Sequence, residues 1–428
     1  MRRFLLGEES SESATNQMIA FIFITFPKIT ETFILREILQ LQKLGVRIEI
    51  FSLLNPSSRN IVHPEAAELV SKTHYSPWLL SLQLWHAHFF YLTRCPIRYL
   101  RLFLRLVAGS ARQPVLLVKT IAIFPKCVFF ARIAQKAGIQ HIHATFASHT
   151  ATCAMVMAEL MQIHYSVTAA AYDLFVETPL LKKLLSHAQF VRTISNFNVR
   201  LIQERYGEYI ASKTYLVRRG IDMHRFRPTP FHSQIDDRNF AILCVATFEH
   251  KKGHQFLLKA ISILRKQDRN IKCVLIGNGP LRNQITDQIE HLKIQDAVIM
   301  VGTKTQEEVL EWLKKSDCFV LPSIIGPGGR KEGIPNVLIE ALSCGLPVVA
   351  TNISGIPEII KDRESGLLVL PEDVDALVAA ISYIQDHPLL AQKLGMAGRE
   401  IVKRDFNIEE NAKKLWNLFM NVLHKCIT

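Results

Sequence analysis

The feature that most constrains the fold is an alternation of apolar runs with helical stretches. Met18 to Phe26 is a continuous apolar run, and a helical stretch from Glu31 to Leu44 and a second apolar run from Arg47 to Leu53 follow it. Runs that are apolar on both faces are typical of buried parallel strands. The start of the chain therefore predicts a βαβ unit.

The same alternation continues and then restarts after about residue 213. The expected strands of the two series are 140–144, 165–169 and 189–194, and then 214–217, 240–245, 272–276, 298–301, 318–321 and 347–350. Two such series predict an α/β chain with two doubly wound, Rossmann-like domains. Ligands of these folds bind at the carboxyl ends of the strands, so we expect a central cleft between the domains to hold the site.

The length of 428 residues suits two to three domains. We expect an N-terminal domain over 1–212 and a C-terminal domain over 213–405. The last segment, 406–428, contains a helix whose Leu415, Trp416 and Phe419 lie on one face. That apolar face predicts packing back toward the N-terminal domain.

Basic residues are concentrated in the N-terminal half of a chain whose net charge is +13. Residues 1–213 carry 23 Lys and Arg against 13 Asp and Glu, or +10, and no acidic residue occurs between Glu68 and Glu159. The region of about 76–136 is also apolar and helical. It admits three interpretations: a nucleic-acid-binding surface, for which no known module is present, a solvated basic face, or a surface for an anionic membrane.

We favour the membrane surface, and we expect no nucleic-acid partner. The apolar stretch 76–92 is shorter than the roughly 20 residues that span a bilayer, which favours peripheral association over insertion. The N-terminal apolar run is too short for a secretory signal, and the eight cysteines show no C-x-x-C spacing. The expected location is therefore the cytoplasm, at the inner face of the cell membrane.

Two carboxylates, Glu332 and Glu340, flank the expected start of a helix. Pro335 suits the first helical turn, and Cys344-Gly345 suits its end. Across a continuous helix the two glutamates would be about 12 Å apart, at ~1.5 Å per residue. That separation is too long for a hydrolytic carboxylate pair and suits the two ends of an extended ligand. Because a helix N-terminus attracts anions, a nucleotide-sugar fits this motif.

Two further loops follow expected strands and contain glycine or lysine. One is Gly277-Asn278-Gly279-Pro280, which permits either a tight turn or close approach of the backbone to a ligand. The other contains Lys251 and Lys252, which form either a solvated basic turn or a phosphate contact. Neither loop decides a function by itself.

In their order along the chain these blocks resemble the retaining glycosyltransferases of family 4, which have the two-domain GT-B fold. The resemblance also rests on Arg218-Arg219-Gly220, Leu321-Pro322-Ser323 and Gly355-Ile356-Pro357-Glu358, and it covers nearly the whole chain. Residues 26–34 and 141–147 are similar to the subgroup that builds exopolysaccharides of the colanic acid type.

The resemblance implies a role for each matching residue. Glu332 contacts hydroxyls of the donor sugar, Glu340 contacts the ribose, and Lys252 neutralises the diphosphate. Transfer retains the anomeric configuration and needs neither a metal nor another cofactor, and the acceptor is a lipid-linked or growing saccharide. The candidate catalytic residues are Glu332, Lys252 and Asp173, and the candidate donor-binding residues are Glu340, Gly333, Ile334, Pro335, Asn336, Val337, Gly277, Gly279, Thr303 and Thr247.

The chain departs from the family pattern at two important positions. Thr247 stands where relatives usually carry an Arg that pairs with the diphosphate, and Ala170 stands where the family places a His near the reacting centre. The subgroup also has His at the positions of Thr145 and Tyr172. Asp173, His143 and His149 remain as polar groups of this region. A second hypothesis is therefore a catalytically impaired GT-B protein that binds nucleotide-sugar and serves a glycan assembly complex as a partner or regulator.

Overall fold

A computed structural model describes residues 17–28, 31–56, 67–78, 81–170, 172–175, 179–228 and 239–425. The chain forms two compact units. Unit 1 comprises Met1–Thr193, Val199–Val217 and Asn411–Thr428, and unit 2 comprises Ile194–Asn198 and Arg218–Glu410. The main division thus falls between Val217 and Arg218, against the expected 212/213.

Within the described ranges, unit 1 contains a seven-stranded parallel sheet with the order β3-β2-β1-β4-β5-β6-β7. Apolar runs made most of these strands predictable, but β3 was missed because its sequence, Thr73-His74-Tyr75, contains no such run. The strands are β1 (Met18–Thr25), β2 (Arg47–Leu54), β3 (Thr73–Tyr75), β4 (His141–Ala144), β5 (His164–Thr168), β6 (Val191–Thr193) and β7 (Thr214–Leu216).

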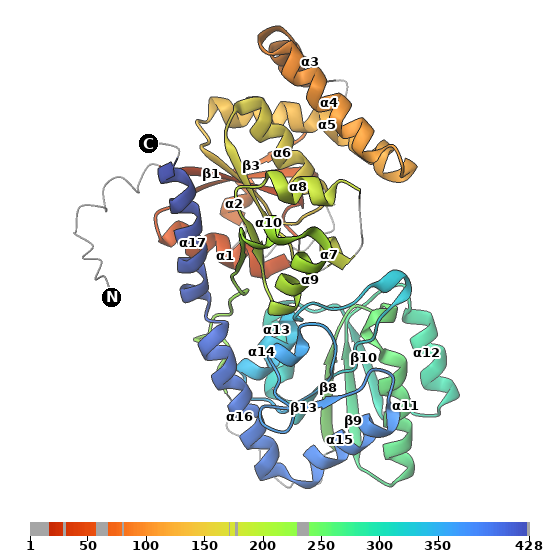
Figure 1. Cartoon of the computed structure of the whole chain (residues 1–428). Coiled ribbons are helices and arrows are strands. Elements are labelled where there is room, and N and C mark those ends of the chain that lie inside the picture. The colour runs from red at the N-terminus through yellow and green to blue at the C-terminus, as the bar shows by residue number, and fades with distance from the viewer. Residues whose placement is uncertain are drawn as a thin grey trace, which may run out of the picture. The chain divides into compact units, whose positions relative to one another are not determined.

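The helices of unit 1 lie on both sides of its sheet (Figure 1). Phe419 of the last helix contacts Phe21 of β1 edge to face, with ring centroids 5.9 Å apart, and Phe51 of β2 contacts Phe130 on the other side. The helices are α1 (Thr32–Lys43), α2 (Ala67–Ser71), α3 (Leu82–Arg94), α4 (Pro96–Ser110), α5 (Pro114–Lys136), α6 (His149–Met161), α7 (Tyr172–Phe175), α8 (Leu181–His187), α9 (Asn196–Tyr206), α10 (Glu208–Ala211) and α17 (Ile408–Lys425).

The basic region expected over 76–136 forms α3, α4 and α5. Across the described segments, α5 is the one helix that is long and apolar enough to cross a membrane, and 39% of its most apolar window is buried. Cys127, Val128 and Phe130 in its second half belong to the buried core. The apolar stretch considered from the sequence was 76–92, whereas the helix long enough to span a bilayer is at 114–136.

Unit 2 contains, in its described part, a six-stranded parallel sheet with the order β10-β9-β8-β11-β12-β13. Its strands are β8 (Phe240–Val245), β9 (Ile271–Ile276), β10 (Val298–Gly302), β11 (Cys318–Leu321), β12 (Val348–Thr351) and β13 (Leu367–Val369). Its helices are η5 (His250–Lys252), α11 (His254–Lys266), α12 (Arg282–His291), α13 (Gln306–Lys314), η6 (Pro327–Gly329), α14 (Asn336–Ser343), η7 (Ile356–Glu358), α15 (Val374–Asp386) and α16 (Pro388–Asp405).

The strand order of unit 2 positions its loops. Successive strands run from β8 outward through β9 to β10, and then continue from β11 on the other side of β8. The crevice at the carboxyl ends of β8 and β11 is therefore the topological switch point, where ligands of doubly wound sheets bind. Residues 246–253 and 322–335 are the loops that flank this crevice.

Candidate functional site

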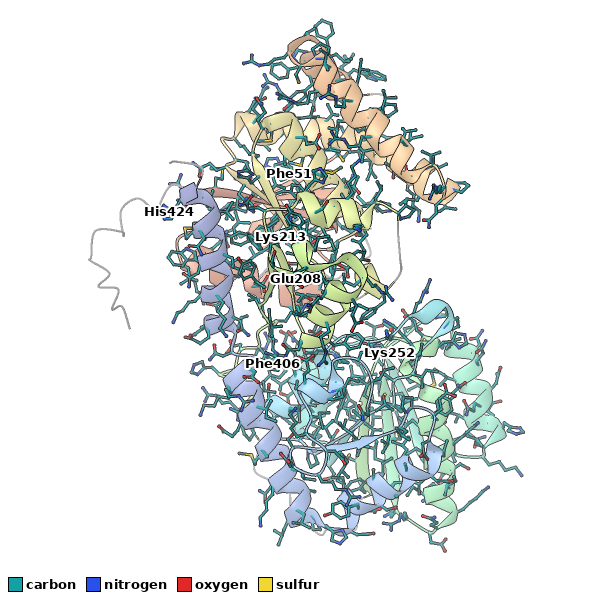
Figure 2. The ribbon with its side chains drawn as sticks, in the orientation of Figure 1. Phe51, Glu208, Lys213, Lys252, Phe406 and His424 are labelled. Atoms are coloured by element: carbon teal, nitrogen blue, oxygen red, sulfur yellow. The ribbon has the colours of Figure 1, made fainter. Side chains whose placement is uncertain are left out.

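Two ammonium groups and one carboxylate meet at the switch point of unit 2. The Nζ atom of Lys252 lies 3.0 Å from Oε2 of Glu332, and the Nζ atom of Lys251 lies 3.1 Å from its Oε1. Glu332 is buried, with an exposed fraction of 7%. Lys252 is labelled in Figure 2, at the edge of the sheet that carries these loops. The structure thus brings together two residues that are 80 positions apart in the sequence.

Backbone contacts between the two loops hold the lysines in place. The N–H group of Ile324 donates to the carbonyl oxygen of Lys251 over 2.8 Å. Gly253 has φ of +67°, and a Cβ there would lie only 1.9 Å from the carbonyl oxygen of Pro322. Glycine is therefore required at this position both for its left-handed backbone and for the close approach. These contacts hold the backbone of residues 251–253 against residues 322–324, and they thereby limit the positions of the two ammonium groups.

The electrostatics of this cluster favour an ionised carboxylate. Burial raises the pKa of Glu332, but the ammonium groups of Lys252 and Lys251 more than offset this effect, so that the pKa is lowered overall. Two positive charges against one negative charge leave the cluster with a net charge of +1. Each carboxylate oxygen contacts one ammonium group and keeps lone pairs for further hydroxyl donors. The cluster can therefore accept hydroxyl groups and attract an anion at the same time.

Glu340 lies on α14 and is also buried, with an exposed fraction of 8%. The Nε2 group of Gln306, the first residue of α13, donates a hydrogen bond to Oε1 of Glu340. The loop 303–305 connects β10 to α13. Thr303, which is exposed, lies in this loop three residues before Gln306. A buried carboxylate with a polar neighbour differs from an ordinary surface residue of a helix.

The helix between the two glutamates begins later than predicted. Pro335 is the N-cap residue, with φ of −65° and ψ of 127°, and α14 starts at Asn336. The prediction that Pro335 lies in the first helical turn was therefore wrong by one position. Gly333, Ile334 and Pro335 are buried, whereas Asn336 and Val337 are partly exposed. The first N–H groups of α14 have no partner within the helix, as at any helix start.

The two glycines of the loop after β9 lie close to the backbone of the loop after β8. A Cβ at Gly277 would lie 1.9 Å from the carbonyl oxygen of Ala246, and one at Gly279 would lie 2.6 Å from that of Phe248. The loop therefore packs tightly on residues 246–248, at whose centre Thr247 is exposed. This packing accounts for both glycines, and their predicted contact with a donor stays a prediction.

Asp173 of unit 1 binds backbone groups. Its Oδ2 atom accepts from the N–H group of Ala147 over 2.7 Å, and its Oδ1 atom accepts from that of Ala170 over 3.2 Å. The carboxylate is buried, with an exposed fraction of 7%, and Ala170 is fully buried. Asp173 thus ties together the loops that follow β4 and β5. Its catalytic role stays a prediction, whereas its role in holding these loops follows from the contacts.

His141 and His143, both on β4, lie in the interior of unit 1. The Nδ1 and Nε2 atoms of His143 lie 2.8 Å from Oγ of Ser166 and 2.9 Å from Oγ1 of Thr168. Burial lowers the pKa of His143 well below its ordinary value and lowers that of His141 to about 3. Both rings are therefore neutral near pH 7. His149, at the start of α6, is partly exposed, and burial also lowers its pKa.

Two polar residues of unit 2 were not among the predicted site residues. Gln306 was missed because nothing in the local sequence indicates its contact with Glu340. Glu358 accepts hydrogen bonds from the backbone N–H groups of Asn196 and Phe197, and it also pairs with Arg218. The Gly-Ile-Pro-Glu motif thus holds the start of α9. No group of three or more metal-ligating side chains occurs in the described residues, and the expected independence from metal stays a prediction.

Comparison with known proteins agrees with this architecture. Residues 226–401 match the family model described as glycosyl transferases group 1. The region matched contains the cluster of Lys251, Lys252 and Glu332 as well as Glu340.

Two curated relatives and one solved structure illustrate the similarity. The colanic acid biosynthesis glycosyltransferase WcaL of Escherichia coli (strain K12) is 28% identical over 94% of this chain and 98% of its own length. The amylovoran biosynthesis glycosyltransferase AmsK of Erwinia amylovora is 35% identical over 46% of this chain and 48% of its own. HepE of Anabaena in complex with UDP-glucose is 14% identical and superposes with a TM-score of 0.67, covering 94% of this chain and 99% of HepE. That last likeness concerns the fold alone.

Proposed function

We propose that this chain, whose residues 226–401 match the group 1 glycosyltransferase model and whose fold is like that of HepE, is a glycosyltransferase that transfers a sugar from a nucleotide-sugar donor to a lipid-linked or polysaccharide acceptor. The product would belong to an exopolysaccharide or another cell-surface glycan, as the names of WcaL and AmsK suggest. The reaction would retain the anomeric configuration, and it would take place in the cytoplasm.

The observation that carries the proposal is the cluster of Lys251, Lys252 and Glu332 at the switch point. A nucleotide-sugar presents hydroxyl groups and a diphosphate close together. Glu332 would accept hydrogen bonds from the sugar hydroxyls, and the lysines would pair with the diphosphate. The N–H groups at the start of α14 would add dipolar stabilisation of the same anion. Glu340 would hold the ribose at the other end of the donor.

The proposed chemistry depends on stabilising the departing diphosphate. The bond between the anomeric carbon and the diphosphate oxygen breaks as the acceptor oxygen bonds to the same face of that carbon. The acceptor proton passes to the departing phosphate oxygen, so no protein nucleophile is needed. Lys252 would contribute most in the transition state, because negative charge grows on the diphosphate as the bond breaks.

We also propose that unit 1 binds the surface of an anionic membrane through α3, α4 and α5. Large apolar side chains on these helices are exposed to solvent, and the intervening basic residues have no acidic neighbours in the sequence between Glu68 and Glu159. Such a surface suits the boundary between headgroups and acyl chains. The exposed apolar residues are Leu82, Trp85, Phe89, Leu92, Ile97, Leu100, Leu104, Val115, Val118 and Ile121.

A transfer assay with UDP- and GDP-sugars tests the main proposal. The purified chain, given a lipid-linked saccharide extract as acceptor, should consume one of these donors and form a product with the donor's anomeric configuration. Glu332→Gln should lower kcat by about 10²–10³, the typical loss when one stabilising polar group is removed from an active site. Glu311→Gln, an exposed glutamate of α13, is the matched control. No turnover with any donor, or wild-type turnover in Glu332→Gln, would refute the proposal.

The binding-only alternative makes a different prediction for the same assay. A catalytically impaired protein would bind UDP or GDP with an affinity that depends on Lys252, yet it would turn over no donor. Donor binding measured beside turnover therefore distinguishes the two hypotheses.

A further inference from the structure

A pocket of about 850 Å³ lies in unit 1, away from the carboxyl ends of its strands. Its walls come from the start of α4, the end of α6, the start of β5 and the end of α8. His164, the first residue of β5, lines it, while Thr168 ends the strand at the opposite edge of the sheet. At roughly 3.3 Å per residue, about 13 Å of strand separates the two edges. The pocket is therefore distinct from any site at the carboxyl edge.

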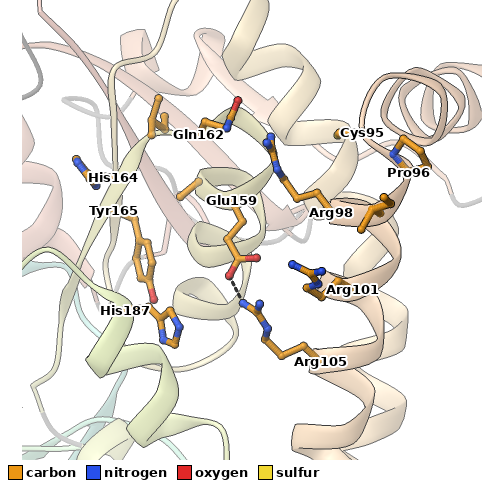
Figure 3. Close-up of a pocket in the computed structure, with 13 residues that line it drawn as sticks. Cys95, Pro96, Arg98, Arg101, Arg105, Glu159, Gln162, His164, Tyr165 and His187 are labelled. Atoms are coloured by element: carbon orange, nitrogen blue, oxygen red, sulfur yellow. Dashed lines mark hydrogen bonds and ion pairs between the residues drawn. The ribbon is translucent and has the colours of Figure 1, made fainter.

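Three arginines of α4 reach into this pocket. Figure 3 shows Arg98, Arg101 and Arg105 on the helix that faces Glu159 and Gln162 of the pocket, with Arg105 reaching Glu159 and Arg98 pointing toward Gln162. Arg105 pairs with Glu159 over 2.6 Å, whereas Arg98 and Arg101 have no ion-pair partner within the described parts of the chain. Three arginines against one glutamate leave the lining with a net charge of +2, counting His164 and His187 as neutral. An open, positively charged pocket with two uncompensated guanidinium groups suits a phosphate.

The pocket borders an exposed apolar row on the same helix. Ile97, Leu100 and Leu104 have the spacing that places side chains on one helical face, and all three are exposed. Arg98, Arg101 and Arg105 repeat that spacing one residue later and so form the adjacent row. Ile97 also lines the pocket. A phosphate site beside an apolar row matches the two chemical parts of a phospholipid.

We infer that this pocket binds the phosphate of an anionic membrane lipid, whose acyl chains lie along Ile97, Leu100 and Leu104. Arg98 and Arg101 contact the phosphate, and Glu159 keeps Arg105 oriented beside it. The inference rests on the membrane association proposed above, to which it adds a defined lipid site, and it does not depend on the transfer reaction. A specific lipid in this pocket would give the membrane contact of unit 1 a fixed orientation.

Vesicle flotation with the full chain tests the inference. The vesicles are phosphatidylcholine alone, or phosphatidylcholine with 30 mole per cent phosphatidylglycerol. Wild type should bind only the anionic vesicles. Arg98→Gln/Arg101→Gln should weaken binding about 30-fold, at ~1 kcal/mol for each basic residue near the surface. The control Lys43→Gln/Arg47→Gln removes the same charge from exposed positions of unit 1 outside α3, α4 and α5 and should change binding less than threefold.

A charge-conserving pair of substitutions separates a pocket from a diffuse basic surface. Arg98→Lys/Arg101→Lys keeps both charges but removes the planar guanidinium fork, so a phosphate site predicts a loss of several-fold. Unchanged binding in this variant, or equal losses in the Gln variant and its control, would overturn the pocket while leaving surface association intact. If wild type ignores anionic vesicles, the proposed membrane association fails as well.

Competition identifies the source of the anion. Inorganic phosphate, or single-stranded DNA at the same phosphate concentration, should not displace the chain from the vesicles, because neither supplies acyl chains. Displacement by either competitor through Arg98 and Arg101 would overturn the assignment to a lipid. UDP or GDP binding, measured in the same variants, should stay at the wild-type level, so that failure of the pocket and failure of the donor site are told apart.

Discussion

The carboxyl edges of the two sheets use charged side chains in different ways. In unit 2, Lys251 and Lys252 share the single carboxylate of Glu332, and the charges remain partly exposed at a crevice. In unit 1, Asp173 binds the backbone N–H groups of Ala147 and Ala170 and is buried. One edge presents charge to a ligand, whereas at the other the carboxylate organises the loops. A carboxylate in a predicted site can therefore belong to the binding surface or can hold the loops that support that surface.

The contrast predicts different consequences when charge is removed from each edge. Removing a lysine from unit 2 should impair ligand binding and turnover while the fold stays intact. Removing the charge of Asp173 from unit 1 should weaken its hydrogen bonds to the backbone of the two loops. Any change in activity should follow only from the greater mobility of these loops.

Among the positive charges of this cluster, removal of Lys252 by Lys252→Met should have the greatest effect. Loss of the ammonium group that pairs with Glu332 should lower kcat/KM for the donor about 100-fold, or about 3 kcal/mol. Lys251→Met should cost less, because the Lys251 side chain is 26% exposed against 12% for Lys252. Steady-state kinetics with the donor that the transfer assay selects measures both variants. Lys259→Met removes an exposed lysine of α11 as the control. Equal, small effects in all three variants would contradict the assignment of Lys252.

Asp173→Asn should act through the backbone of unit 1. Hydrogen bonds to a charged group contribute about 2 kcal/mol, so the amides of Ala147 and Ala170 should exchange with solvent about 30-fold faster. Hydrogen exchange read by mass spectrometry measures this change. Glu68→Gln, whose fully exposed carboxylate pairs with Lys72, should leave exchange unchanged. If Asp173→Asn abolishes turnover while both amides keep their protection, Asp173 acts on the substrate and the contrast between the two edges fails.

Acid should weaken unit 2 through His254. Burial, and then the charge of Lys252, lowers the pKa of this imidazole to about 4, and neither ring nitrogen has a hydrogen-bond partner among the described residues. The unfolded chain takes up a proton below about pH 6.5, whereas the folded chain does so only near pH 4. The contribution of the neutral His254 imidazole to the free energy of unfolding is therefore fully present above pH 6.5, and it is lost as the pH falls toward 4.

Between pH 7 and pH 5.5, His254 should lower the free energy of unfolding by about 1 kcal/mol. His254→Leu should remove that dependence, and the protection factors of the β8 amides in the full chain would report it. His291→Leu, an exposed histidine of α12, serves as the control. An unchanged pH dependence in His254→Leu would show that other groups determine the acid response of unit 2.

The sequence identified the long elements and the order of the motifs, because apolar runs and glycine turns are local signals. The expected strand 240–245 coincides with β8, whereas β3 contains no apolar run, and β13 was not predicted although its three residues are apolar. The pairing of Lys251 and Lys252 with one carboxylate depends on strand order, so it could not be derived from spacing. The sequence also could not show that Gly277 faces Ala246, since a glycine fits a ligand and a neighbouring backbone equally well.

Two substitutions test the positions that depart from the family pattern, and Thr247→Arg should have the weakest effect of all. Thr247 is exposed, so Thr247→Arg can place a guanidinium beside the crevice without disturbing the core. We expect it to tighten donor binding by a few-fold, since an exposed charged contact adds about 1 kcal/mol or less. Ala170 is fully buried, and Ala170→His would force an imidazole into packed space at a cost of about 1–3 kcal/mol. Titration calorimetry with UDP or GDP measures the first variant, and Thr286→Arg, at an exposed threonine of α12, is its control. If Thr247→Arg weakens nucleotide binding while Thr286→Arg does not, Lys251 already occupies the space that an arginine would need, and the departure at Thr247 is compensated within the cluster of Lys251, Lys252 and Glu332.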